Sequence, residues 1–197
     1  MPNKLSLVAL LILMMSASLF AQIQPSARES SSSLSVGGEL STFNPDWGCS
    51  SNSPLACWNH QLLGFGVYVD ANRIIQKFGA EGEARWLHWR GPGAGLVESS
   101  YLLGPRYEFI HHGKLAVYGK VLMGGGWITL SNDIGKGSYF AFAPGGTVEY
   151  KLSKQFTLRG DYEYQMWPAF SGVTSLGNNG LTPNGLSFGV SYRIHRK

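Results

Sequence analysis

Residues 138–166 read SYFAFAPGGTVEYKLSKQFTLRGDYEYQM, and apolar and polar side chains alternate along most of this stretch. From 156 to 166, the even positions are aromatic or aliphatic, apart from Gly160, and the odd positions are polar or charged. From 140 to 152, the large apolar side chains again hold the even positions. Successive residues of a β-strand point to opposite faces of a sheet. The stretch therefore predicts two antiparallel strands joined by a short turn at 153–155.

The same two-residue period extends over the rest of the chain. In each segment that carries more than one charge, all charged side chains fall on one parity. The pattern predicts an all-β fold of eight strands, each with one apolar and one polar face. The segments are 34–43, 62–72, 78–89, 97–109, 115–129, 138–152, 156–167 and 186–194.

The aromatic residues indicate which face points outward. A soluble β-sandwich would also alternate, but its charged face would meet water. Here one set of rings lies at strand ends that adjoin short connections, and a second set lies at ends that adjoin long ones. Two such belts are typical of a membrane barrel at its two lipid–water interfaces. The rings are Phe78, Tyr107, Phe109, Tyr150, Phe156 and Tyr192 in the first set, and Trp86, Trp89, Trp127, Tyr139 and Trp167 in the second.

The connections agree with this arrangement, because short segments alternate with mostly longer ones rich in Gly, Asn, Ser and Pro. An even strand number with short turns on one side is the outer-membrane layout. We therefore predict a closed eight-stranded antiparallel transmembrane β-barrel, narrow enough to be filled by side chains. The short segments are 73–77, 110–114 and 153–155, and the others are 44–61, 90–96, 130–137 and 168–185.

Composition excludes several other classes. The 197 residues include 16 Lys+Arg, 12 Asp+Glu, 26 Gly and only 2 Cys. The abundance of aromatic residues excludes a disordered tail, and the cysteine count excludes a cysteine-stapled miniprotein. The excess positive charge is spread along the chain, so it gives no support for nucleic-acid binding.

The N-terminal segment predicts export. Lys4 precedes an uncharged, mostly apolar run over 5–20, which indicates a signal peptide of residues 1–21 cleaved after Ala21. An uncleaved membrane anchor is the alternative. Residues 22–33 then form a flexible leader, and 34–197 form the barrel domain. The expected location is the outer membrane of a Gram-negative-type bacterium, in contact with its lipids and lipopolysaccharide.

The charged parity would line the lumen, where an unpaired charge is costly. We therefore expect a hydrogen-bonded network of ion pairs inside the barrel, with the acidic surplus at its wetted ends. The predicted members are Glu39, Asp70, Glu81, Glu83, Arg85, Arg106, Lys120, Glu149, Arg159, Asp161, Glu163 and Arg193.

Two prolines conflict with a closed ladder, because Pro105 and Pro144 have no N–H to donate. Each stands beside a glycine, which predicts a β-bulge at each site.

Residues 187–194, SFGVSYRI, resemble the C-terminal β-signal of outer-membrane proteins, with matches at Ser187, Gly189, Tyr192 and Ile194. This resemblance implies that Ser187–Ile194 contacts the barrel-insertion machinery, although Ile194 replaces the usual aromatic residue and three residues follow it. Over 34–194 the chain resembles OmpA/OmpX-like barrels and outer membrane beta-barrel domain proteins, which implies a fold and a location but no activity. The segments that carry the resemblance are RWLHW at 85–89, LGPRY at 103–107, APGG at 143–146, RGDYEY at 159–164 and LTPNG at 181–185.

Cys49 and Cys57 lie in the first long connection. In an exported protein this spacing favours a disulfide that closes the loop. A metal-binding pair assisted by His60 is the alternative.

A catalytic site at the outer rim is a further alternative. Some eight-stranded barrels are lipid A-modifying enzymes with His, Ser and an acid at the rim, and His88, Glu98 and Ser100 lie near that level here. Strand parity, however, turns His88 toward lipid and the other two toward the lumen. His111 and His112 indicate a solvated inner turn in preference to a metal site. We therefore predict no catalytic residue, cofactor or metal.

The favoured function is a non-catalytic structural or surface-interaction protein that acts through its outer loops. Trp47, Trp58 and Phe170 are the candidate contact residues in these loops. Besides the lipid A-modifying acyl hydrolase or transferase, a soluble lipocalin-like carrier remains an alternative, and it would need the apolar parity to line a ligand cavity.

Overall fold

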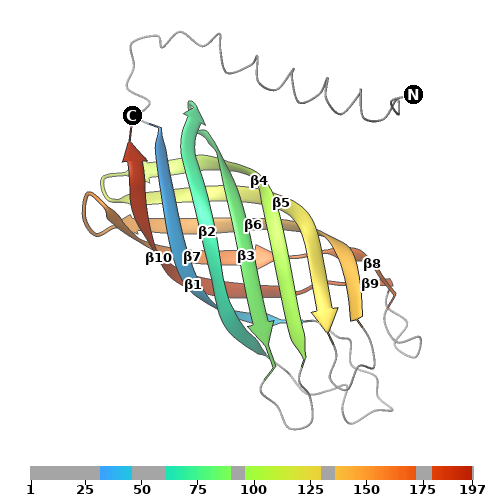
Figure 1. Ribbon diagram of the computed structural model, residues 1–197. Coiled ribbons are helices and arrows are strands. Elements are labelled where there is room, and N and C mark those ends of the chain that lie inside the picture. Colours follow the sequence, from blue (N-terminus) through green and yellow to red (C-terminus); the bar gives the residue numbers. More distant parts are fainter. Residues whose placement is uncertain (1–31, 46–60, 90–95, 130–135, 172–178, 197) are drawn as a thin grey trace, which may run out of the picture. The chain divides into compact units, whose positions relative to one another are not determined.

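A computed structural model describes residues 32–45, 61–89, 96–129, 136–171 and 179–196 (Figure 1). The described residues form ten strands, and eight of them close into an antiparallel barrel in the order β1-β10-β7-β6-β5-β4-β3-β2. This architecture confirms the predicted fold. None of the described residues belongs to a helix that is long and apolar enough to cross a membrane. The barrel strands are β1 (Ser33–Asn44), β2 (Leu62–Ile75), β3 (Phe78–His88), β4 (Val97–His112), β5 (Leu115–Thr129), β6 (Lys136–Lys151), β7 (Phe156–Tyr164) and β10 (Asn184–Arg196).

The barrel closes where its first and last strands pair, with Leu40 opposite Phe188. Both side chains point outward and are 72% and 65% exposed, whereas the Arg85 side chain on the other parity is fully buried. The charged parity therefore faces the lumen and the apolar parity faces outward. This outcome removes the apolar ligand cavity that a lipocalin-like carrier would need.

One end of the barrel carries the short turns and both chain ends of the barrel (Figure 1). The turns are 76–77, 113–114 and 152–155. Gly113 has a φ of 57°, which glycine adopts without the steric cost met by other residues. β4 continues to His112, so the predicted turn 110–114 shrinks to its last two residues. We call this the inner end, and the opposite end the outer end.

The predicted long connection 168–185 is only partly a loop. β8 (Trp167–Ser171) and β9 (Asn179–Leu181) form a separate two-stranded sheet at the outer end. An isolated bridge between Phe142 and Met166 joins the start of this hairpin to β6. The ladder thus continues beyond β7 because β6 still offers partners there.

The predicted bulges at Pro105 and Pro144 do not form. Ala80 pairs with Pro105 and Val121 pairs with Pro144, and the register stays constant on both sides of each proline. Both prolines are on the outward parity, so each removes one donor while the flanking bonds hold the strands aligned. The register shifts that occur in the barrel lie at Leu34/Ser35, Ala71/Ile75 and Glu108/Ile110, all near the inner end.

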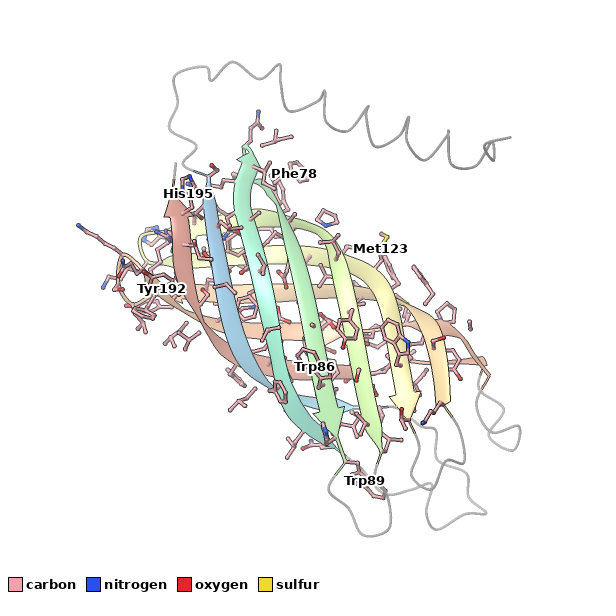
Figure 2. The ribbon with its side chains drawn as sticks, viewed as in Figure 1. Phe78, Trp86, Trp89, Met123, Tyr192 and His195 are labelled. Atoms are coloured by element: carbon pink, nitrogen blue, oxygen red, sulfur yellow. The ribbon has the colours of Figure 1, made fainter. Side chains whose placement is uncertain are left out.

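Aromatic rings form contacts at both ends of the outward face. At the inner end, Phe78 and Tyr107 have ring centroids 4.8 Å apart. At the outer end, Trp86 contacts Tyr101 at 5.8 Å, and Tyr101 contacts Trp127 at 5.2 Å. Figure 2 shows Phe78 and Trp86 at these two levels of β3.

Three rings of the predicted outer belt have a different role. Trp167 is fully buried inside the barrel, and Trp89 and Tyr139 pack against the same buried cluster. Trp167 shares the odd parity of the charged residues on β7, which already placed it on the lumen side.

Candidate functional site: the filled lumen

A lysine ammonium lies at the centre of the polar lumen. Lys120 on β5 points inward, and its Nζ lies 3.0–3.1 Å from carboxylate oxygens of four residues on β3 and β7. These residues are Glu81, Glu83, Asp161 and Glu163. Three of them, Glu83, Asp161 and Glu163, would suit a metal ion by the spacing of their oxygens. The ammonium contacts all three, so it supplies the positive charge that a cation would bring.

Arg85 on β3 joins the first strand to the seventh. Its guanidinium lies 3.1 Å from Glu39, 2.8 Å from Glu83 and 2.9 Å from Glu163. Its Cζ also lies 4.4 Å from the centroid of the Phe43 ring, a cation–π contact. Because Glu83 and Glu163 also contact Lys120, the two cations share a pair of carboxylates.

Arg159 on β7 extends the network toward the inner end. It donates to Glu81, to Asp161 at 3.0 Å and to Asp70 at 3.3 Å. Its Cζ lies 4.0 Å from the centroid of the Tyr68 ring. This guanidinium therefore connects the central carboxylates to Asp70.

Arg106 on β4 completes the inner side of the network. Its guanidinium lies 2.6 Å from Asp70 and 2.6 Å from Glu149, and its Cζ lies 3.9 Å from the Tyr118 ring centroid. Because Asp70 contacts both Arg106 and Arg159, the four cations in the middle of the lumen (Arg85, Arg106, Lys120 and Arg159) belong to one connected cluster. We call it the ion network.

The acidic surplus lies in the middle of the barrel. Four cations meet seven carboxylates in the ion network, and most of these carboxylates are less than 5% exposed. The expectation that wetted ends take up the surplus is therefore wrong. Each cation has room for several carboxylates because strands on opposite walls of a narrow barrel present side chains to the same point.

Apolar side chains fill the lumen at the outer end. The hairpin β8–β9 contributes Trp167, whose ring lies over Gly126, where an added Cβ would come within 2.4 Å of it. Sequence reasoning missed this cluster, although the glycine opposite a lumen-facing tryptophan was a usable signal. We call it the apolar plug, and its members are Phe43, Leu62, Leu87, Leu96, Leu102, Leu122, Ile128, Ala141, Ala143, Trp167 and Leu181.

A hydrogen-bonded chain joins the apolar plug to the ion network. The Trp167 indole donates to Gln165 Oε1 at 2.8 Å, and the Gln165 amide donates to Glu163 Oε1 at 2.7 Å. Both residues are fully buried. The chain fixes the indole ring relative to the charged side chains below it.

Glu98 is the exception within the plug. It is 1% exposed and lies opposite Leu87 and Ile128 in the sheet. Neither of its carboxyl oxygens has a hydrogen-bond partner among the described residues.

The remaining sequence-predicted residues fall into three groups. His88 lies on the outward parity of β3, while Glu98 and Ser100 are buried in the lumen on β4, so the three do not form a site. Arg193 does not join the ion network, because it lies at the inner end and donates to the Lys154 carbonyl at 3.2 Å. Cys49, Cys57, Trp47 and Trp58 lie outside the described residues, and Phe170 falls in β8, with no description of its side chain.

The chain is similar in sequence to a known family of proteins. The family model of the outer membrane protein beta-barrel domain matches residues 7–193. No curated protein matches the chain in sequence.

Solved structures share the fold at low sequence identity. Neisserial surface protein A (NspA) is 14% identical with a TM-score of 0.60, over 82% of this chain and 97% of that one. OprG from Pseudomonas aeruginosa is 13% identical with a TM-score of 0.55, over 84% and 96%. Ail, the attachment invasion locus protein of Yersinia pestis, is 17% identical with a TM-score of 0.51, over 85% and 100%.

Proposed function

The chain belongs to the outer membrane protein beta-barrel domain family and resides in a Gram-negative outer membrane, and we propose that it is a non-catalytic surface-interaction protein. In this proposal residues 1–21 are the signal peptide and the barrel is a rigid, filled support. Its outer loops bind a surface ligand, and loop 46–60 makes the main contact.

The filling of the lumen is the observation that carries this proposal. The ion network crosses the barrel from β1 through β7, and the apolar plug lies between the network and the outer loops. Buried ion pairs and close-packed side chains leave no wide aqueous path for a solute. A barrel that transports nothing large acts through the surfaces it displays.

The composition of loop 46–60 supports a contact role. It holds two tryptophans, Trp47 and Trp58, on either side of the Cys49–Cys57 pair. Aromatic side chains are enriched at binding hot spots, and a closed loop loses less entropy on binding. Ail, described as an attachment invasion locus protein, shares the fold, which favours an attachment assay as the first experiment.

Replacing residues 46–60 by a short Gly-Ser linker tests the proposal. The variant should insert and keep its heat-modifiable gel migration, because the ion network and every member of the plug lie outside residues 46–60. Binding of purified lipopolysaccharide and attachment of expressing cells to matrix-coated plates should both be lost. The matched control is the same replacement at 130–135.

Two outcomes would contradict the proposal. Unchanged attachment and lipopolysaccharide binding after the replacement would remove loop 46–60 from the function. A change in lipid A mass in cells that express the intact protein would instead establish an enzymatic activity.

A further inference from the structure

A polar cavity of about 120 Å³ opens at the inner end of the barrel, on the far side of the ion network from the loops. Its walls come from the ends of β2, β4, β6 and β10 and from the starts of β1, β5 and β7. In the outer-membrane layout this end faces the periplasm. The cavity is therefore separate from any surface that the outer loops display.

The two carboxylates of the lining already have cationic partners. Arg73 binds Glu108 through two hydrogen bonds, of 2.7 and 3.1 Å. Glu149 accepts from Arg106 at 2.6 Å. Arg193 adds a further positive charge to the lining. The cavity therefore has a positive balance, which favours an anionic occupant.

Two buried polar atoms of the lining lack a partner among the described residues. Arg193 Nε is a donor without an acceptor, and Asn72 Oδ1 is an acceptor without a donor. Asn72 is 8% exposed. Arg193 is held in place because its Nη1 donates to the Lys154 carbonyl at 3.2 Å, across the turn that follows β6. Buried polar atoms of a folded protein are normally paired with protein groups or water, so both atoms are available to a polar molecule that enters the cavity.

The alternation of side chains along β10 also turns Arg193 toward the cavity. Figure 2 labels Tyr192 and His195 at this end of the strand. Tyr192 is exposed on the outward parity, and Arg193, the next residue, points to the lumen side. The Arg193 guanidinium therefore points into the cavity and away from the lipid.

We propose that this inner-end cavity binds a small periplasmic molecule that carries a carboxylate or phosphate group next to an N–H or O–H donor. Arg193 binds the anionic group, since a guanidinium presents donors that match carboxylate and phosphate oxygens. Asn72 Oδ1 accepts from the neighbouring donor. A free amino acid and the C-terminal residue of a peptide both have this chemistry.

The test uses the complete mature chain, refolded in a maltoside detergent and labelled with ¹⁵N. Glycine, glycylglycine, acetate and inorganic phosphate are titrated at constant ionic strength while the Arg193 Nε–Hε and Asn72 side-chain resonances are followed. Glycine and phosphate should give saturable shifts, with acetate about tenfold weaker than glycine because it lacks the donor for Asn72. If glycylglycine binds as tightly as glycine or more tightly, the natural ligand is a peptide C-terminus. If glycylglycine binds more weakly than glycine, the natural ligand is a free amino acid.

Substitutions locate the binding. Arg193→Gln should abolish the saturable shifts, and Arg193→Lys, which keeps the charge but loses Nε, should weaken them about tenfold. Lys114→Gln is the matched control, because Lys114 is exposed in the inner turn 113–114 outside the lining. Shifts that rise linearly without saturation in the wild type, or equal losses in the Lys114 and Arg193 variants, would overturn the proposal.

Discussion

The ion network and the apolar plug fill the same lumen by opposite means. In the network, each cation contacts at least two carboxylates, and the side chains reach across the barrel. In the plug, aliphatic side chains, one phenyl ring and one indole close the lumen by packing, as in the core of a soluble protein. The two regions are stacked along one barrel, so the same strands support both.

The difference indicates what the network contributes. Burying charge costs desolvation free energy, and well-packed apolar residues would fill the same space at least as stably. The charges contribute register, because a shift by one residue would turn them toward lipid at a cost of about 2–4 kcal/mol for each Arg or Lys near the midplane. An apolar plug gives no such discrimination, since its side chains tolerate lipid. We infer that the network selects the fold and the plug closes the lumen.

Removing a cation from the network should have the largest effect. Arg159→Ala or Arg106→Ala leaves buried carboxylates without a counter-charge, so the free energy of unfolding should fall by about 3–5 kcal/mol. The measurement is the unfolding midpoint in detergent. Lys136→Ala, at an exposed position near the outer end, is the control and should change the midpoint far less. Equal midpoints for all three variants would show that the network is not a cooperative unit.

Opening the plug should have a somewhat smaller effect. Trp167→Ala leaves a cavity above Gly126 and breaks the hydrogen bond to Gln165, so we expect a loss of about 3 kcal/mol. Trp127→Ala removes the same side chain from the outward face, where it is 43% exposed, and should cost less. Denaturant titrations of both variants in the same detergent measure the difference. A larger loss for the Trp127 variant would mean that the aromatic belt, and not the plug, stabilises the outer end.

The sequence was sufficient to place the charges inside the barrel, but not to pair them. The parity of Lys120 or Arg159 follows from a period of two within one strand, and this short-range pattern is visible in the chain. Partners such as Arg85 and Glu163 are 78 residues apart, and they meet only because of the barrel's closure and register. The pairing is thus a property of the topology.

The outer end was the least predictable part for a related reason. Residues 168–185 are rich in Gly, Asn and Pro, which favours a loop, yet β8 and β9 pair there and place Trp167 in the lumen. Local composition cannot show that β6 extends past the end of β7 and has backbone groups there with which Met166 can pair. The predicted bulges at Pro105 and Pro144 were wrong because a barrel strand can lose one hydrogen-bond donor without a change of register.

The smallest expected change is a gain in stability, in contrast to the losses above. It concerns Glu98, the carboxyl group buried in the plug. Glu98 lacks the hydrogen-bond partners that every carboxylate of the network has among the described residues, so no hydrogen bond offsets the desolvation cost of its charged form. Glu98→Leu should therefore raise the free energy of unfolding by about 1–2 kcal/mol, because it replaces an unsatisfied polar group with a packed apolar one. Glu83→Leu is the matched control: Glu83 contacts both Arg85 and Lys120, and its loss should destabilise the barrel. If Glu98→Leu lowers the unfolding midpoint as much as Glu83→Leu does, Glu98 has a stabilising partner and the plug is not apolar throughout.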